Sequence, residues 1–267
     1  MPSEAGTGAT GNPARVEPAL VQITYVGHAT VLLELDGVRV LTDPILRRRV
    51  VHLRMLCDPP SPSLLGTIDA VVVSHAHRDH LDVRSLRRLD PGVRIIAPAA
   101  ALPSLRRRGF GRPVDAVEAG DAVTIRGVDI RATPALHGRP GSAVGFLLRG
   151  SATVYFAGDT DVFPEMAGLA DPLDVALLPV WGWGPTLGPG HLDPERAVEA
   201  ALLLQPRVVV PIHWGTLHPL GMSGRSFLTE PPLVFARLAR ERLPGVAIRV
   251  LQPGESAVLT VARGFVR

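Results

Sequence analysis

The chain has 267 residues, of which 46% are hydrophobic and 20% charged, so it is long enough to bury one large core. Its aromatic content of 4% argues against a base-stacking nucleic-acid module, and no apolar run approaches the ~20 residues of a membrane span. All 28 cationic side chains are arginine and the net charge is only +3. The single cysteine, Cys57, excludes an intrachain disulfide and is typical of a cytoplasmic protein.

Residues 1–18 are rich in glycine, alanine, threonine and proline. They lack the basic and apolar regions of a signal peptide, and their composition predicts a disordered tail. We expect the remainder, residues 19–267, to form a single domain.

Three short apolar runs open that domain, and each predicts a strand: residues 21–25, 31–35 and 38–41. Between the second and third runs, Asp36-Gly37 is a strong hairpin signal. Three consecutive strands without a glycine-rich phosphate loop favour a mixed α/β sandwich with antiparallel pairs over a Rossmann sheet. Residues 45–66 contain several prolines and no clean period, so we expect a long loop there.

The densest group of chemically active side chains follows residues 68–73, an apolar, β-branched run that predicts a buried strand. His75, His77, Asp79 and His80 come directly after it. Imidazole nitrogens and carboxylate oxygens are ligands that suit zinc and similar divalent ions. His75 and His77 are two residues apart, so an extended backbone points both to one side. Asp79 and His80 could reach a second ion. The alternative is a histidine-rich surface loop.

Short strands and helices fill the rest of the chain. Strands are predicted at residues 93–96, 114–117, 122–125, 128–133, 143–148, 152–157, 174–179, 208–212, 247–250 and 257–261. Helices are predicted at residues 83–89, 99–108, 197–204 and 231–243. Asp193 and Pro194 suit the N-cap and first position of the third helix. Three more metal-type side chains follow strands: His137, Asp159 and His213. Taken alone, His137 would be an ordinary loop histidine and Asp159 a turn cap.

Several other residues have two interpretations each. Asp43 directly follows a strand, where it could accept the second N–H of a ligand histidine, and His28 is either a turn histidine or a support near the metals. Trp181 and Trp183 lie in the glycine-proline loop 181–190, where they either pack the loop or line a substrate cleft. The chain has two runs of three arginines, at residues 47–49 and 106–108, and both are interpreted as solvated faces. The run at residues 47–49 could instead attract an anionic substrate.

The His-x-His-x-Asp-His pattern at residues 75–80 resembles the signature of the metallo-β-lactamase superfamily. The resemblance implies an αββα sandwich with a one- or two-metal site at one edge, and further ligands downstream in the order His, Asp, His. It implies that one ion is held by His75, His77 and His137. It implies that a second ion is held by Asp79, His80 and His213, with Asp159 bridging the two. His28 and Asp43 lie in segments similar to the superfamily's Gly-His-Ala and Thr-Asp-Pro motifs and are expected to support the ligands.

A narrower resemblance covers roughly residues 20–245. The segments His191 to Val198, Ile212 to Thr216 and Glu230-Pro231-Pro232 are similar to those of N-acyl-phosphatidylethanolamine-hydrolysing phospholipase D and its bacterial relatives. The broader relatives include sugar-phosphate lactonases of the ascorbate pathway. This resemblance implies that His191 projects into the active site without being a principal metal ligand. It would donate a hydrogen bond to substrate or shuttle a proton. The alternative is a residue that packs on the helix start.

These patterns together predict a hydrolase with two Zn²⁺ ions, whose bound water has a pKa lowered from ~15.7 to about 7 and so supplies hydroxide. Asp79 and His191 are the expected catalytic residues. A phosphodiester is the first choice of substrate, and a lactone or other carboxylic ester is the second. A non-catalytic metal-bound sensor or scaffold, and an oxygen-reducing di-iron protein, are the other classes. Mn²⁺ or Fe²⁺ would suit the same ligands.

The expected partner is a small-molecule or lipid-derived substrate, with no nucleic acid. No transmembrane segment is predicted, and peripheral membrane contact through the loops 45–66 and 181–190 stays open. The sequence does not predict an oligomeric state.

Overall fold

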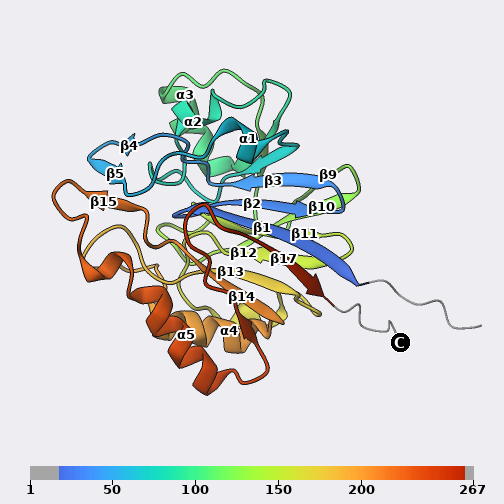
Figure 1. Cartoon of the computed structure of the whole chain (residues 1–267). Coiled ribbons are helices and arrows are strands. Elements are labelled where there is room, and N and C mark those ends of the chain that lie inside the picture. Colours follow the sequence, from blue (N-terminus) through green and yellow to red (C-terminus); the bar gives the residue numbers. More distant parts are fainter. Residues whose placement is uncertain (1–17, 262–267) are drawn as a thin grey trace, which may run out of the picture.

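The computed structural model describes residues 18–261, so residues 1–17 of the predicted disordered tail lie outside the described residues. Two seven-stranded sheets dominate it (Figure 1). The first sheet has the order β17-β1-β2-β3-β6-β7-β8. Its strands are β1 (Ala19–Gly27), β2 (Thr30–Leu35), β3 (Val38–Thr42), β6 (Ala70–Val72), β7 (Arg94–Pro98), β8 (Asp115–Val117) and β17 (Ser256–Val261).

The second sheet has the order β16-β14-β13-β12-β11-β10-β9. Its strands are β9 (Ala122–Ile125), β10 (Val128–Pro134), β11 (Val144–Arg149), β12 (Thr153–Phe156), β13 (Val175–Pro179), β14 (Val208–Ile212) and β16 (Ala247–Ile248). Each sheet joins antiparallel strands to parallel ones. Strands β3, β6, β7 and β8 are parallel neighbours in the first sheet, and β12, β13, β14 and β16 are parallel neighbours in the second.

The helices form outer layers on both sides of the two sheets (Figure 1). On the side of the first sheet lie α1 (Pro62–Leu65), α2 (Val83–Leu86) and α3 (Leu102–Arg107), the last preceded by the 3₁₀ turn η1 (Ala99–Ala101). On the side of the second lie α4 (Pro194–Leu204) and α5 (Pro231–Arg242). Two further 3₁₀ turns are η2 (Pro164–Gly168) and η3 (Ser226–Leu228). The order helix, sheet, sheet, helix confirms the predicted αββα sandwich.

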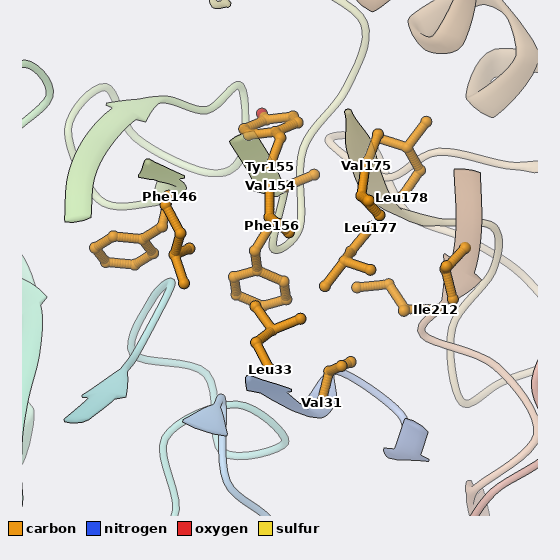
Figure 2. Packing of buried hydrophobic residues seen from close by; sticks show 14 of the residues in the cluster. Val31, Leu33, Phe146, Val154, Tyr155, Phe156, Val175, Leu177, Leu178 and Ile212 are labelled. Carbon is orange, nitrogen blue, oxygen red and sulfur yellow. The ribbon is translucent and has the colours of Figure 1, made fainter. Parts of the chain in front are cut away.

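Apolar side chains from the facing sheets make the main core. Val31 and Leu33 of β2 point toward Phe156 of β12 and Leu177 of β13, while Tyr155 points to the opposite face (Figure 2). This is the period-2 alternation that the strand predictions used. A second core lies between the first sheet and its helices, where it includes Leu41, Val71, Leu86 and Leu105.

Local sequence signals explain several boundaries. Asp36 and Gly37 have φ of 52° and 74°, as a two-residue type I′ hairpin requires. Asp193 accepts a hydrogen bond from Arg196 N at 2.9 Å and Pro194 begins α4, so the predicted cap is confirmed.

Within residues 18–261, no helix is long and apolar enough to cross a bilayer.

The prediction of a structureless loop at residues 45–66 was wrong. This segment contains β4 (Arg49–Val50), β5 (Leu53–Met55) and α1. Strand β5 pairs with β15 (Leu217–Pro219), which gives a small third sheet in the order β15-β5-β4. The predicted helix at 99–108 begins as the 3₁₀ turn η1, and the helix predicted at 83–89 ends as an α-helix at Leu86.

Candidate metal centre

Loops that follow strands of both sheets meet at one place. The loop after β6 carries residues 74–80, and the loops after β10, β12 and β14 carry His137, Asp159 and His213. His75 makes an isolated β-bridge with Ala143, and Val144 N donates to Ser74 O at 3.0 Å. These contacts join the loop after β6 to β11 of the other sheet, so the histidine-rich segment lies across the end of the sandwich.

One group of donor atoms consists of one ring nitrogen from each of His75, His77 and His137, and these three nitrogens lie within 4.8 Å of one another. His137 Nδ1 donates to Gly190 O at 2.7 Å, so its Nε2 faces His77 Nδ1 at 3.2 Å. His75 Nδ1 lies 3.0 Å from Ser74 Oγ, and His75 Nε2 is buried without a hydrogen-bond partner.

A second group consists of Asp79, His80, His213 and His28. His80 Nδ1 donates to Asp43 Oδ2 at 2.7 Å, and His213 Nδ1 donates to Trp181 O at 2.6 Å. These two bonds turn the remaining nitrogens inward, where the two Nε2 atoms lie 3.0 Å apart. His28 Nε2 lies 3.2 Å from Asp79 Oδ2.

Asp159 lies between the two groups. Its Oδ2 is 3.2 Å from His80 Nε2 and 3.7 Å from His75 Nε2, and its Oδ1 is 3.1 Å from His213 Nε2. Although close to His213, Oδ1 has no well-aligned hydrogen bond and is buried. The two carboxylate oxygens therefore contact histidines of both groups, which is the position that a bridging ligand would occupy.

Asp43 is fully buried and bonds to the loop after β6 through both oxygens. Oδ1 accepts from Ser74 N at 2.6 Å, and Oδ2 accepts from Ser74 Oγ and His80 Nδ1. A carboxylate that orients a ligand histidine in this way is a common support in metal sites. Ser74, which also contacts His75, was missed by the sequence predictions. Its position between a buried strand and the histidine motif was the available signal.

The three carboxylates around His80 place negative charge in the cluster that a bound cation would compensate. Burial lowers the pKa of His80, but the charges of Asp159, Asp79 and Asp43 outweigh burial and hold it well above its usual value. Within the described residues no arginine pairs with any of these three carboxylates. Two buried polar atoms without a hydrogen-bond partner, His75 Nε2 and Asp159 Oδ1, also favour a bound cation. The residues therefore fit divalent cations.

Other donors are held in forms that can bind a cation. Burial lowers the pKa of His213 to about 3, and burial together with its histidine neighbours lowers the pKa of His75 well below the usual value. Both imidazoles are therefore neutral at pH 7. Burial raises the pKa of Asp159, but His213 and His80 outweigh it, so this carboxylate stays ionised.

His191 adjoins the cluster from the start of α4. Its Nδ1 donates to Gly188 O at 3.0 Å, and its Nε2 lies 3.4 Å from Asp159 Oδ2. The side chain is 23% exposed, against 2% for Asp159, so it is the more accessible of the two from solvent. The structure thus brings His191 beside Asp159 and His137, while its catalytic role stays a prediction.

The tryptophans pack their own loop to different degrees. Trp181 Nε1 donates to Gly184 O at 2.9 Å, and its ring packs against the main core. Trp183 lies edge-on to His52 with ring centroids 5.4 Å apart and contacts the apolar cluster around Ile45. Both side chains are half-buried, and a role in a substrate cleft stays a prediction.

Four residues of the two arginine runs are exposed as expected, and the other two, Arg47 and Arg108, are partly buried. Arg47 makes a bidentate ion pair with Asp82, with Nε and Nη2 at 2.6 and 2.9 Å from the carboxylate oxygens. Arg108 is partly buried and donates to Leu81 O at 2.7 Å and Ala76 O at 3.4 Å. These acceptors are backbone carbonyls of the histidine-rich loop, which no local sequence pattern could reveal.

Two sheets between helical layers, with this histidine and aspartate cluster at their end, define the metallo-β-lactamase fold. Residues 38–214 match the family described as Beta-lactamase superfamily domain. Within this superfamily, the chain belongs to the UPF0173 family of metal-dependent hydrolases.

Relatives in that family match along most of their length. A UPF0173 metal-dependent hydrolase of Aeropyrum pernix is 31% identical over 257 residues, covering 89% of this chain and 97% of the relative. One from Opitutus terrae is 33% identical over 250 residues, covering 88% and 99%. Among solved structures, Igni18, a metallo hydrolase of Ignicoccus hospitalis, has a TM-score of 0.71 at 27% identity and covers 91% of this chain and 100% of its own.

Proposed function

We propose that this metal-dependent hydrolase binds two Zn²⁺ ions and hydrolyses a phosphodiester. In this proposal His75, His77 and His137 hold one ion, and Asp79, His80 and His213 hold the other. Asp159 holds both. The observation that carries the proposal is the position of Asp159, whose oxygens lie 3.1–3.7 Å from histidines of both donor groups. Fe²⁺ and Mn²⁺ suit the same donors and are the alternatives.

When bound, a pair of ions would supply a water of lowered pKa and positive charge for both the attacking and the leaving oxygen. The protein's own task is to hold its ligands rigidly. Asp43, Gly190 O and Trp181 O each fix one imidazole through its Nδ1 and so point its Nε2 inward. His28 Nε2 contacts Asp79 Oδ2 and so keeps that carboxylate directed toward His80.

His191 is proposed to act on the substrate rather than on the ions. Gly188 O engages its Nδ1, which leaves Nε2 directed toward Asp159. From this position the imidazole can donate a proton to an oxygen of the substrate or of the leaving group. The rigid start of α4, capped by Asp193, supports it from behind.

A phosphodiester is preferred over a lactone because two adjacent cations can neutralise both oxygens that exchange at phosphorus. The narrower resemblance to the phospholipase D-like branch supports this choice. The expected substrate is small or lipid-derived, and the expected location is the cytoplasm. A lactone or other carboxylic ester is the second candidate, on the basis of the lactonases within the same resemblance.

The test is hydrolysis of bis(p-nitrophenyl) phosphate and of a lactone panel by protein reconstituted with Zn²⁺, Mn²⁺ or Fe²⁺. We expect the diester to be hydrolysed fastest by the zinc form. The Asp159→Ala variant should be inactive, and His218→Ala should match the wild type, because buried His218 lies outside every donor group. Faster turnover of lactones than of the diester would contradict the proposed substrate class, and wild-type activity in Asp159→Ala would contradict the bridging role of Asp159.

A further inference from the structure

A cavity of about 570 Å³ lies beside the histidine-rich loop, between that loop, β4, α2 and the segment that follows α3. Its volume is in the range of small-molecule binding sites. Six arginines line it: Arg47, Arg49, Arg78, Arg84, Arg87 and Arg108. Among the lining residues the only acidic side chain is Asp82.

Both oxygens of the Asp82 carboxylate already accept hydrogen bonds from protein groups. Both of its oxygens accept from Arg47, and Oδ2 also accepts from Ser85 N and Oγ at the start of α2. It therefore neutralises one guanidinium, and the other five charges of the cavity wall have no acid in the lining to compensate them.

Two of those five arginines are fixed by carbonyl oxygens rather than by acids. Arg87 Nη2 donates to Gly109 O at 2.6 Å, and Arg108 Nη1 donates to Leu81 O at 2.7 Å. Carbonyls orient a guanidinium without cancelling its charge. Burial, and then the charge of Arg78, lower the pKa of Arg108, as expected for a cation held near other cations.

The remaining three, Arg49, Arg78 and Arg84, are exposed, and their side chains make no hydrogen bond or ion pair within residues 18–261. Their donors are free for a ligand. A guanidinium offers several N–H groups in a planar fork that matches carboxylate and phosphate oxygens, and several around one concave space raise the local concentration of anions.

We infer that this arginine-lined cavity binds a small organic anion carrying two or more phosphate-like or carboxylate groups. The cavity is lined by Arg78 and Leu81 but by none of the metal-type donors of the cluster, so it is a site beside the metal centre rather than part of it. The inference does not depend on the proposed reaction.

Ethane-1,2-disulfonate is a suitable probe, because its two charges are permanent and sulfonates coordinate metal ions weakly. Calorimetric titration of the metal-loaded protein at constant ionic strength should detect its binding. The Arg49→Gln/Arg84→Gln double variant should bind the disulfonate at least about tenfold more weakly, because each of the two substitutions removes a charge-assisted contact. Methanesulfonate, with one charge, should bind more weakly than the disulfonate.

A matched control removes the same charge elsewhere. Arg237→Gln/Arg242→Gln alters two exposed arginines of α5, on the opposite helical layer of the molecule (Figure 1). This variant should bind the probe as the wild type does, and at one probe concentration the Tm of both should rise by more than that of Arg49→Gln/Arg84→Gln. Equal affinities in all three proteins, or no binding by the wild type, would overturn the inference.

Discussion

At the scale of single residues, Asp43 controls the centre of the donor cluster without belonging to either ligand set. Its Oδ2 accepts the Nδ1 proton of His80 at 2.7 Å, and its Oδ1 accepts from Ser74 N. This supporting role was predicted from the position of Asp43 directly after a buried strand and from the resemblance of its segment to the superfamily's Thr-Asp-Pro motif. Its hydrogen-bonded neighbour Ser74 was missed, although its position between the buried strand and the histidine motif was an available signal.

Replacing Asp43 by asparagine should lower metal affinity by roughly 10–100-fold, because an amide N–H₂ or a weaker acceptor would face His80 Nδ1. Competition with a chromophoric chelator measures this directly. Asp174→Asn is the matched control, since Asp174 is also buried and accepts from Thr153 N at 2.8 Å but lies outside every donor group. The same loss of affinity in both variants would show that Asp43 acts only through general stability.

His191→Ala tests the assignment of a substrate-directed role. The side chain lies outside both proposed ligand sets, so the metal content should be unchanged while kcat falls by about 10²–10⁴-fold if His191 moves a proton. If it only orients substrate, KM should rise with kcat preserved. Steady-state kinetics beside zinc analysis distinguish these results, with His218→Ala as control. Loss of one ion would make His191 a ligand, and unchanged kcat/KM would leave it only a packing role.

At the scale of elements, the loops after β6 and β12 meet so closely that Gly158 admits no side chain. It has a φ of 60°, and a Cβ built there would lie 2.5 Å from Ser74 Cβ. Gly141 has a similar φ of 73° but nothing within 4 Å of its built Cβ. Comparing an alanine substitution at each of the two glycines therefore separates the cost of crowding from the cost of the backbone conformation.

Gly141→Ala should lower the free energy of unfolding by about 1–2 kcal/mol, the usual cost of a left-handed conformation for a residue with a Cβ. Gly158→Ala should cost more than this and should also weaken metal binding, because it displaces Ser74 from Asp43. Guanidinium unfolding of both variants at fixed metal concentration provides the comparison. Equal losses in the two variants would mean that the loops can separate freely.

Element by element, the sequence predicted the two large sheets well and the third sheet not at all. The strands of the large sheets have apolar alternation or buried β-branched runs, and turn residues such as Asp36-Gly37 separate them. Strands β4, β5 and β15 have only two or three residues each, and β5 pairs with a strand far along the chain. Short strands stabilised by distant partners leave no local period to detect.

At the scale of the whole molecule, the candidate site exists only because the two sheets pack face to face. The first sheet supplies the loop with residues 74–80, and the second supplies His137, Asp159 and His213. The set was predicted from the histidine motif at residues 75–80 together with the downstream ligands that its resemblance to the metallo-β-lactamase superfamily implies. The distances that make Asp159 a bridge depend on the packing of the sandwich, and they became visible only in the structure.

The central claim is that these donors form two metal sites that share Asp159, and metal counting tests it most directly. The protein is purified without chelators, incubated with excess Zn²⁺, dialysed and measured by elemental analysis against protein concentration. We predict two equivalents of zinc per chain, falling to one or none in Asp159→Ala. A ratio that stays near one under metal excess in the wild type would contradict the two-metal account.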